Sequence, residues 1–205
     1  MFNLITIAVP IPMTTRNDTI RKHLADMQAV EAHILAAVKR QLSETEELAT
    51  APSQVEPLLR RIESTLTTHT ETLNLLSERY DGNTQANFKK IVTEFFGMLA
   101  GIYDKVRERE VSRMLRDDYT ALSLAAMGYT AMHSFGLAIG EDDIATMAQR
   151  HLEDLTPLLM DLSRTLPYVV VQEVAEENDF PVDTTVGARA LENTQRAWEP
   201  DVAYA

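Results

Sequence analysis

Apolar residues recur at spacings of three and four along most of this chain, which is the period of a helix that buries one face. The two clearest stripes are separated by the polar run SETEELATAPS, and Gly82 closes the second of them. The middle of the chain lacks the alternation of apolar and polar residues that marks a half-buried strand. The pattern therefore predicts an all-α protein with five main helices. These cover residues 18–44, 54–80 and 85–109, a fourth segment that ends at Gly140, and a fifth that runs from Asp142 or Asp143 through Leu162.

The boundary between the third and fourth helices has the weakest signal, because no Gly or Pro separates them. We place it at the charged run REREVS, since a single helix over 85–139 would far exceed the ordinary length. Within the fifth helix, Pro157 removes one backbone donor. We therefore expect the helix axis to bend there and the carbonyl of Glu153 to lose its helical partner.

A length of 205 residues fits one domain with tails. Residues 1–16 are expected to form an N-terminal arm and residues 17–166 the helical bundle. Residues 167–177, which include YVVVQEV, predict a short packed segment, either strand or helix. Residues 178–205 are polar and contain two prolines, so we expect a mobile C-terminal tail. Its single tryptophan, Trp198, is a possible anchor for a protein partner.

Composition excludes several classes of function. The formal net charge of −12 argues against nucleic acid or an anionic membrane surface as a partner. The absence of cysteine excludes disulfides, thiolate metal sites and a cysteine nucleophile. The apolar start MFNLITIAVPIPM lacks a basic region, is broken by two prolines and is too short to span a bilayer, so we expect a cytoplasmic protein. Phosphate loops, G-x-S-x-G, H-E-x-x-H and EF-hand motifs are also absent from the sequence.

Four predicted helices each carry one ionisable residue where the inner stripe calls for an apolar one: Glu31, His69, His133 and His151. Glu31 and His69 lie about 13 and 15 residues from the connection between their helices, so they are expected to face each other within roughly one helical turn. His133 and His151 are each about 7 to 9 residues from theirs and are also expected to be nearly level. The spacing leaves the relative height of the two pairs open.

Imidazoles and carboxylates inside a helical bundle are typical ligands of iron, manganese or zinc. Two facing histidines can instead hold a haem, and a bundle core can also hold a lipid. The structural interpretation, which we favour, expects no cofactor, because a buried Glu and His satisfy each other and threonines around His69 offer hydroxyl partners. The alternative is a metal site. Its candidate ligands are Glu31, His69, His133, His151 and Glu153.

Two long helices, a helical crossover and a second helix pair are the plan of the ferritin-like four-helix bundle. The stretch DYTALSLAAMGYTAMHSFGLAIGEDDIATMAQRHLED resembles the second half of the bacterial YciE/YciF-like branch of that superfamily, and DMQAVEAHIL is similar to its first helix. The resemblance covers about residues 18–166. It implies a di-iron site built from acidic residues on all four bundle helices and an E-x-x-H motif on two of them.

The chain departs from this family pattern at most ligand positions. Glu31 matches the first-helix ligand, and Glu153 or Asp154 falls near the acidic cluster of the last helix. None of the five histidines has a Glu three residues before it, so no E-x-x-H motif is present. The other acidic positions of the family fall near Thr67 and Thr68 and among Leu122, Ala125 and Tyr129.

These departures predict a non-enzymatic ferritin-like protein without a standard di-iron centre, with a stress-associated or interaction role. Its apolar helices predict a homo-oligomer. The alternative function is an atypical oxidase or metal-storage protein that uses iron, manganese or zinc at the Glu/His positions.

Overall fold

The computed structural model describes residues 15–43, 51–80 and 110–198. These residues form helices and connecting turns, with no strand among them, so the prediction of an all-α protein is confirmed for this part of the chain. The third predicted helix, at 85–109, and most of the N-terminal arm lie outside the described residues. The elements are α1 (Arg16–Ser43), α3 (Val55–Tyr80), α5 (Val111–Ile139), α6 (Asp142–Glu177), the short 3-10 helix η1 (Thr184–Val186) and α7 (Gly187–Trp198).

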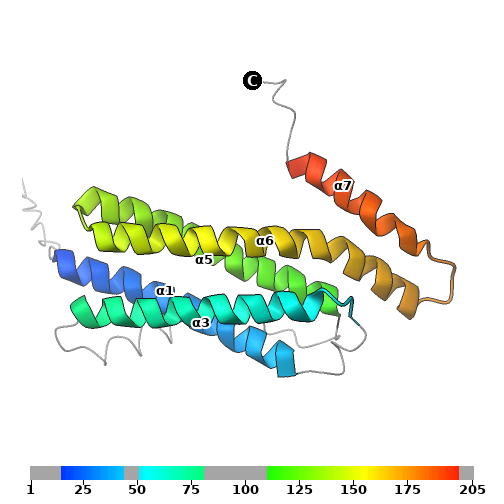
Figure 1. Ribbon diagram of the computed structural model, residues 1–205, viewed down its shortest axis with the longest axis horizontal. Coiled ribbons are helices and arrows are strands. Elements are labelled where there is room, and N and C mark those ends of the chain that lie inside the picture. Colours follow the sequence, from blue (N-terminus) through cyan, green and yellow to red (C-terminus); the bar gives the residue numbers. More distant parts are fainter. Residues whose placement is uncertain (1–14, 44–50, 81–109, 199–205) are drawn as a thin grey trace, which may run out of the picture.

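The four long helices lie side by side in two pairs (Figure 1). Helix α1 packs along α3, and α5 packs along α6. The pairs meet through α1 against α5 and α3 against α6, so each long helix contacts two others. The inner faces of all four helices therefore enclose one common core.

The predicted stripes supply that core. The inner positions are apolar and buried, as the helical period requires. Because the two helix pairs bury their apolar stripes against each other, a side chain at an inner stripe position can reach solvent only between two adjacent helices. The largest fully buried apolar side chains include Ile20, Leu24, Ile34, Leu59, Ile62, Leu66, Leu73, Leu115, Leu122 and Met132.

The turn between α5 and α6 is tight and depends on glycine. Gly140 has a φ of 68°, in the left-handed region, and its N–H donates to the carbonyl of Leu137 at 3.2 Å. The N–H of Glu141 donates to the carbonyl of Gly136 at 2.9 Å. This closure sets α5 and α6 antiparallel from their first turn, as the short link in the sequence predicts.

The segment after residue 166 is helical, which is one of the two forms expected for it, but it is not a separate element. The segment 167–177 is a continuation of α6, which runs through both Pro157 and Pro167, and Figure 1 shows its C-terminal part turning away from the line of its first half. Each proline removes only one helical donor, and Val169 is buried beyond the second of them, so packing maintains the helix.

The tail expected at 178–205 contains a helix. Asp183 accepts a hydrogen bond from the backbone N–H of Thr185 at 3.0 Å and caps η1. Helix α7 follows with good helix formers, and its first residue, Gly187, lies against the Tyr168 ring of α6. Local capping and propensity therefore order a stretch whose polar composition suggested otherwise. Residues 199–205 lie outside the described part.

Helix α5 is long and apolar enough to cross a membrane when judged by length and composition alone, and it is the single such helix among the described residues. A core helix of a soluble protein meets the same test. Its buried side chains, including Leu115 and Leu122, pack in the common core.

Candidate metal centre

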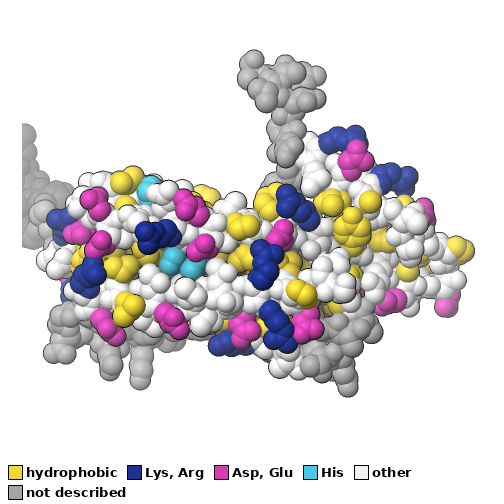
Figure 2. All heavy atoms as spheres, in the orientation of Figure 1, with side chains coloured by type: hydrophobic (Ala, Val, Ile, Leu, Met, Phe, Trp, Pro, Cys, Tyr) yellow, Lys and Arg dark blue, Asp and Glu magenta, His cyan; other side chains and the backbone are white. Residues whose placement is uncertain are grey.

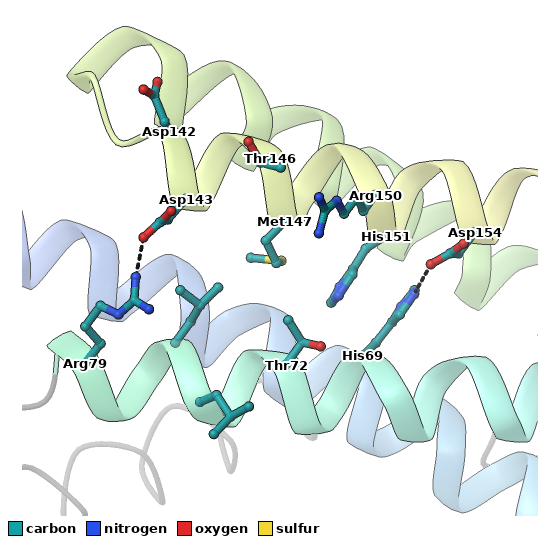
Figure 3. A pocket seen from close by; sticks show the side chains of 12 residues that line it. His69, Thr72, Arg79, Asp142, Asp143, Thr146, Met147, Arg150, His151 and Asp154 are labelled. Atoms are coloured by element: carbon teal, nitrogen blue, oxygen red, sulfur yellow. Dashed lines mark hydrogen bonds and ion pairs between the residues drawn. The ribbon is translucent and has the colours of Figure 1, made fainter.

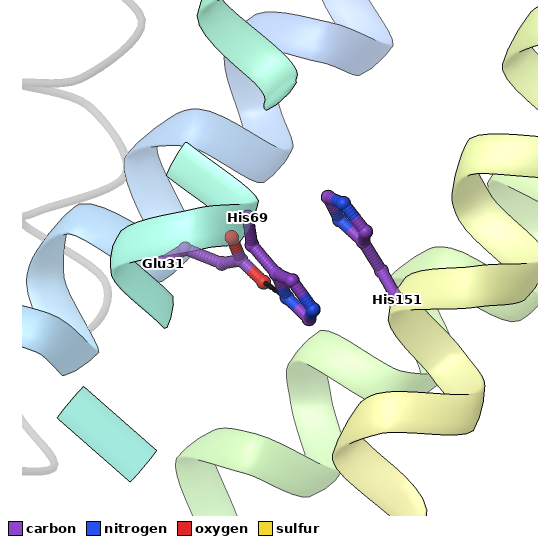
Figure 4. A group of neighbouring side chains, drawn as sticks. All are labelled: Glu31, His69 and His151. Carbon is purple, nitrogen blue, oxygen red and sulfur yellow. Dashed lines mark hydrogen bonds and ion pairs between the residues drawn. The ribbon is translucent and has the colours of Figure 1, made fainter. Parts of the chain in front are cut away.

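Three of the predicted residues converge in the core. Glu31 of α1, His69 of α3 and His151 of α6 each offer one ligand atom, and these atoms all lie within 4.8 Å of one another (Figure 4). All three side chains are buried, with Glu31 fully enclosed. We call these three residues the Glu–His cluster.

Helical spacing places each of these side chains on an inner face. His69 follows Leu66 by one turn and precedes Leu73, and both leucines are fully buried. His151 lies between Ala148 and Leu155 in the same way. The cluster thus replaces one apolar layer of the core, which is why its polar atoms must find partners within it.

The predicted contact between Glu31 and His69 is confirmed. The Nδ1 atom of His69 lies 2.8 Å from Oε1 of Glu31. On its other side, Nε2 of His69 lies 3.3 Å from Oδ2 of Asp154, a largely exposed residue of α6 (Figure 3). The ring of His69 therefore bridges a buried carboxylate and a surface carboxylate.

His69 and His151 form a stacked pair. Their ring centroids are 3.6 Å apart and their planes differ by 2°. Burial is the main cause that lowers the pKa of His151 to about 3, and repulsion from the charge of neighbouring His69 adds to it. His151 is therefore a neutral imidazole at physiological pH and keeps a lone pair for a ligand.

Tyr129 of α5 completes the surroundings of the cluster. Its ring stands edge-on to both imidazoles, with centroid distances of 4.9 Å to His151 and 6.0 Å to His69. Burial raises the pKa of Tyr129 well above 10, and the nearby Glu31 carboxylate adds to this effect. The sequence pattern placed Tyr129 on the inner stripe but gave it no role. The sequence did contain one sign of a role, because the hydroxyl of Tyr129 is a polar group at a predicted core position.

Several polar atoms of this region lack partners. Oε2 of Glu31, Nδ1 of His151 and the hydroxyl of Tyr129 are buried and make no hydrogen bond within the part of the chain that the structure describes. Buried polar atoms are rarely left this way, because each loses its hydration without compensation. Here the three residues come from three helices that meet at the cluster, and the Tyr129 hydroxyl interacts with the Glu31 carboxylate.

Two predicted site residues lie elsewhere. The Nδ1 atom of His133 lies 2.8 Å from the carbonyl oxygen of Ala145, so its ring links α5 to α6 near their turn. Glu153 is exposed and accepts a hydrogen bond from Gln149 at 2.8 Å. The helical period explains the result for His133: inner-face positions on α5 recur each turn, and Tyr129, one turn before His133, is the residue that reaches the cluster. Asp154, not Glu153, faces His69.

The cluster opens onto a surface pocket between α3 and α6, which we call the α3–α6 pocket. Its volume is about 520 Å³, and His69 and His151 form part of its wall. Figure 2 shows histidine side chains reaching this face among apolar and charged ones. Arg79 forms an ion pair with Asp143 across the pocket, and Arg150 borders it from α6 (Figure 3). Solvent and small molecules can therefore approach the imidazoles from one side.

A second buried polar pair lies apart from the cluster, between α1 and α5. The side-chain amide of Gln41 donates to Oδ1 of Asp118 at 2.9 Å, and Asp118 is fully buried. Burial raises the pKa of Asp118 to about 7, and the neighbouring charge of Asp117 adds to this although the bond from Gln41 opposes it. The sequence pattern gives no signal for this pair, since an aspartate one position off the apolar stripe resembles a solvated residue.

Comparison with known proteins returned no relatives. No family model matches the chain, and neither the curated proteins nor the solved structures include a significant match. The interpretation of the site therefore depends on its own geometry.

Proposed function

We propose that this protein binds one transition-metal ion per chain through the Glu–His cluster. A carboxylate and two imidazoles suit Zn²⁺, Fe²⁺ and Mn²⁺. The observation that supports this most is the convergence of Glu31, His69 and His151 from three helices, with their ligand atoms within 4.8 Å of one another.

The unpartnered atoms agree with this proposal. Oε2 of Glu31 and Nδ1 of His151 have no hydrogen-bond partner among the described residues. A cation would give each of them a partner. The low pKa of His151 keeps that ring neutral, which is the form that binds metal.

Binding requires a local rearrangement. Lone pairs of an imidazole lie in the ring plane, and the two rings are parallel and 3.6 Å apart. One ion cannot lie in both planes, so at least one ring must turn when the ion binds. Both rings border the α3–α6 pocket, which gives them room on that side. The same pocket leaves a coordination position open to water or a small ligand.

The competing function is purely structural, and the bond between Glu31 and His69 favours it. At 2.8 Å this pair satisfies one atom of each partner without a metal. In that case the cluster serves only to define how α1 packs on α3. The two proposals differ in the role of His151. The structural proposal leaves its Nδ1 atom without an interaction, whereas the metal proposal makes His151 a ligand.

The ferritin-like fold remains our proposal for the architecture. The pairing of α1 with α3 and of α5 with α6 supports it. A standard di-iron centre is not part of the proposal, because the chain has no E-x-x-H motif and a single acidic residue in the Glu–His cluster. Homo-oligomer formation and a stress-associated role stay predictions.

Calorimetric titration of the metal-free full-length protein tests metal binding. Zn²⁺, Mn²⁺ and anaerobic Fe²⁺ are added in turn to wild type, His69→Gln and His151→Gln. The expected result is one site per chain for at least one ion, with affinity reduced at least tenfold in each variant. His133→Gln is the matched control, since His133 contacts the Ala145 carbonyl and should leave binding unchanged. Equal binding by all four proteins, or by none, would contradict the proposal.

A further inference from the structure

The arrangement around the cluster assigns a role to the buried phenol. Glu31, His69, Tyr129 and His151 come from α1, α3, α5 and α6 respectively, so each long helix contributes one polar side chain to the same part of the core. Metal sites in helical bundles are built in this way, from inward-facing side chains on several helices. Tyr129 is the member of this group that is neither a carboxylate nor an imidazole.

We propose that the phenolate oxygen of Tyr129 is a further ligand of the bound ion and that the site thereby prefers ferric iron. This rests on the proposed metal binding at the Glu–His cluster. Tyr129 would join the Glu31 carboxylate and the two imidazoles, giving two anionic oxygen donors and two nitrogen donors. Hard anionic oxygens favour an ion of high charge over a divalent one.

The burial of the hydroxyl supports this assignment. Tyr129 is fully buried, and its hydroxyl lies near enough to the Glu31 carboxylate to interact with it, although it makes no hydrogen bond of ordinary geometry within residues 15–43, 51–80 and 110–198. A phenylalanine would fill the same space, so packing alone does not explain the hydroxyl, which stands beside a proposed oxygen ligand. The centroid of the Tyr129 ring lies 4.9 Å from that of His151 and 6.0 Å from that of His69, so the phenol adjoins both residues proposed as nitrogen ligands.

A trivalent ion beside the oxygens of Glu31 and Tyr129 attracts both of them as anions, so ligation of Tyr129 goes with loss of its phenolic proton. On binding, the O–H bond of Tyr129 breaks, an Fe–O bond forms, and the proton leaves to solvent. The iron enters as Fe³⁺ and its oxidation state does not change.

Visible spectroscopy of the ferric protein tests the assignment. Metal-free full-length wild type, Tyr129→Phe and Tyr119→Phe are each loaded from ferric citrate, desalted and analysed for bound iron. Phenolate coordinated to Fe³⁺ produces a charge-transfer band in the visible, which carboxylate and imidazole ligands do not. Tyr119 is the matched control because it lies on the same helix, ten residues and about 15 Å from Tyr129 along the axis.

The expected result is a coloured wild type and a coloured Tyr119→Phe protein, with the band lost in Tyr129→Phe while iron remains bound at no less than half of the wild-type content. Resonance Raman spectra of wild type, excited in the band, should show phenolate ring vibrations, which tests the assignment even if Tyr129→Phe fails to fold. Colourless ferric wild type, or a band retained in Tyr129→Phe, overturns the assignment. Binding of Zn²⁺ without binding of Fe³⁺ also overturns it and leaves the proposed function standing, whereas binding of neither ion overturns both.

Discussion

Oε1 of Glu31 lies 2.8 Å from Nδ1 of His69, and this contact between α1 and α3 is fully enclosed in the core. Removing Glu31 leaves the buried His69 with only the surface carboxylate of Asp154, and removing His69 leaves Glu31 buried without its imidazole partner. Either change is more costly than removing both residues. In the metal-free protein, Glu31→Leu and His69→Leu should each lower the free energy of unfolding by about 3 kcal/mol. Urea denaturation curves provide the measurement.

The double variant Glu31→Leu/His69→Leu should regain most of this loss and unfold within about 1 kcal/mol of wild type. Such a result would mean that folding does not require the pair. If the two losses instead add, the pair is not energetically coupled and the close contact contributes nothing specific.

The buried Asp118 should make the free energy of unfolding depend on pH. Its pKa is about 7 in the folded protein and 3.8 as an ordinary aspartate, so between these values the folded state holds more protons than the unfolded state. Stability must then fall as the pH rises from about 4 to 7, on the order of 4 kcal/mol in all, at about 1.4 kcal/mol per pH unit.

Asp118→Asn removes this titration and supplies an amide donor next to Gln41, whose Oε1 is buried without a partner among the described residues. Its stability relative to wild type should therefore increase between pH 4 and pH 8. Denaturation at several pH values measures the difference. Parallel curves for the two proteins over this range would show that Asp118 is not held in a protonated state by burial.

Two glycines of α5 provide a matched pair of substitutions. A Cβ on Gly136 would lie 2.7 Å from the backbone nitrogen of Ala145, so Gly136→Ala must push α6 away from α5. A Cβ on Gly128 would lie 2.6 Å from the sulfur of Met27, the end of a flexible side chain that can move. Because alanine also favours the helix by about 1 kcal/mol, Gly128→Ala should be nearly neutral.

Gly136→Ala should lower the free energy of unfolding by about 1 to 3 kcal/mol, as overpacking does. Thermal unfolding followed by circular dichroism compares the two variants directly. Equal stabilities would contradict the close α5–α6 contact at Ala145.

Much of the fold follows from periodicity. The stripes predicted helices at 18–44 and 54–80, and the structure has them at Arg16–Ser43 and Val55–Tyr80. Gly140 ends α5 as predicted, because only a residue without a side chain adopts its backbone conformation easily. Counting residues from the turn was also sufficient to pair Glu31 with His69.

The remaining features depend on information that a stripe does not contain. Periodicity assigns Tyr129 and His133 to the same face of α5, one turn apart, and side-chain packing decides which of them meets the cluster. The parallel stack of His69 and His151 depends on side-chain torsions. Helix α7 depends on the cap at Asp183 and on contact with Tyr168, which outweigh the polar composition of the segment.

The central claim is that Glu31, His69 and His151 hold one metal ion, and anomalous diffraction from crystals of the zinc-loaded protein tests it most directly. The expected result is a single strong peak about 2 Å from one atom of each side chain, with the two imidazole planes no longer parallel. The opposite result would keep the ring centroids of His69 and His151 stacked at 3.6 Å and the Glu31–His69 bond intact. Zinc would then be absent or bound at Asp142 and Asp143 on the pocket rim, and the claim would be contradicted.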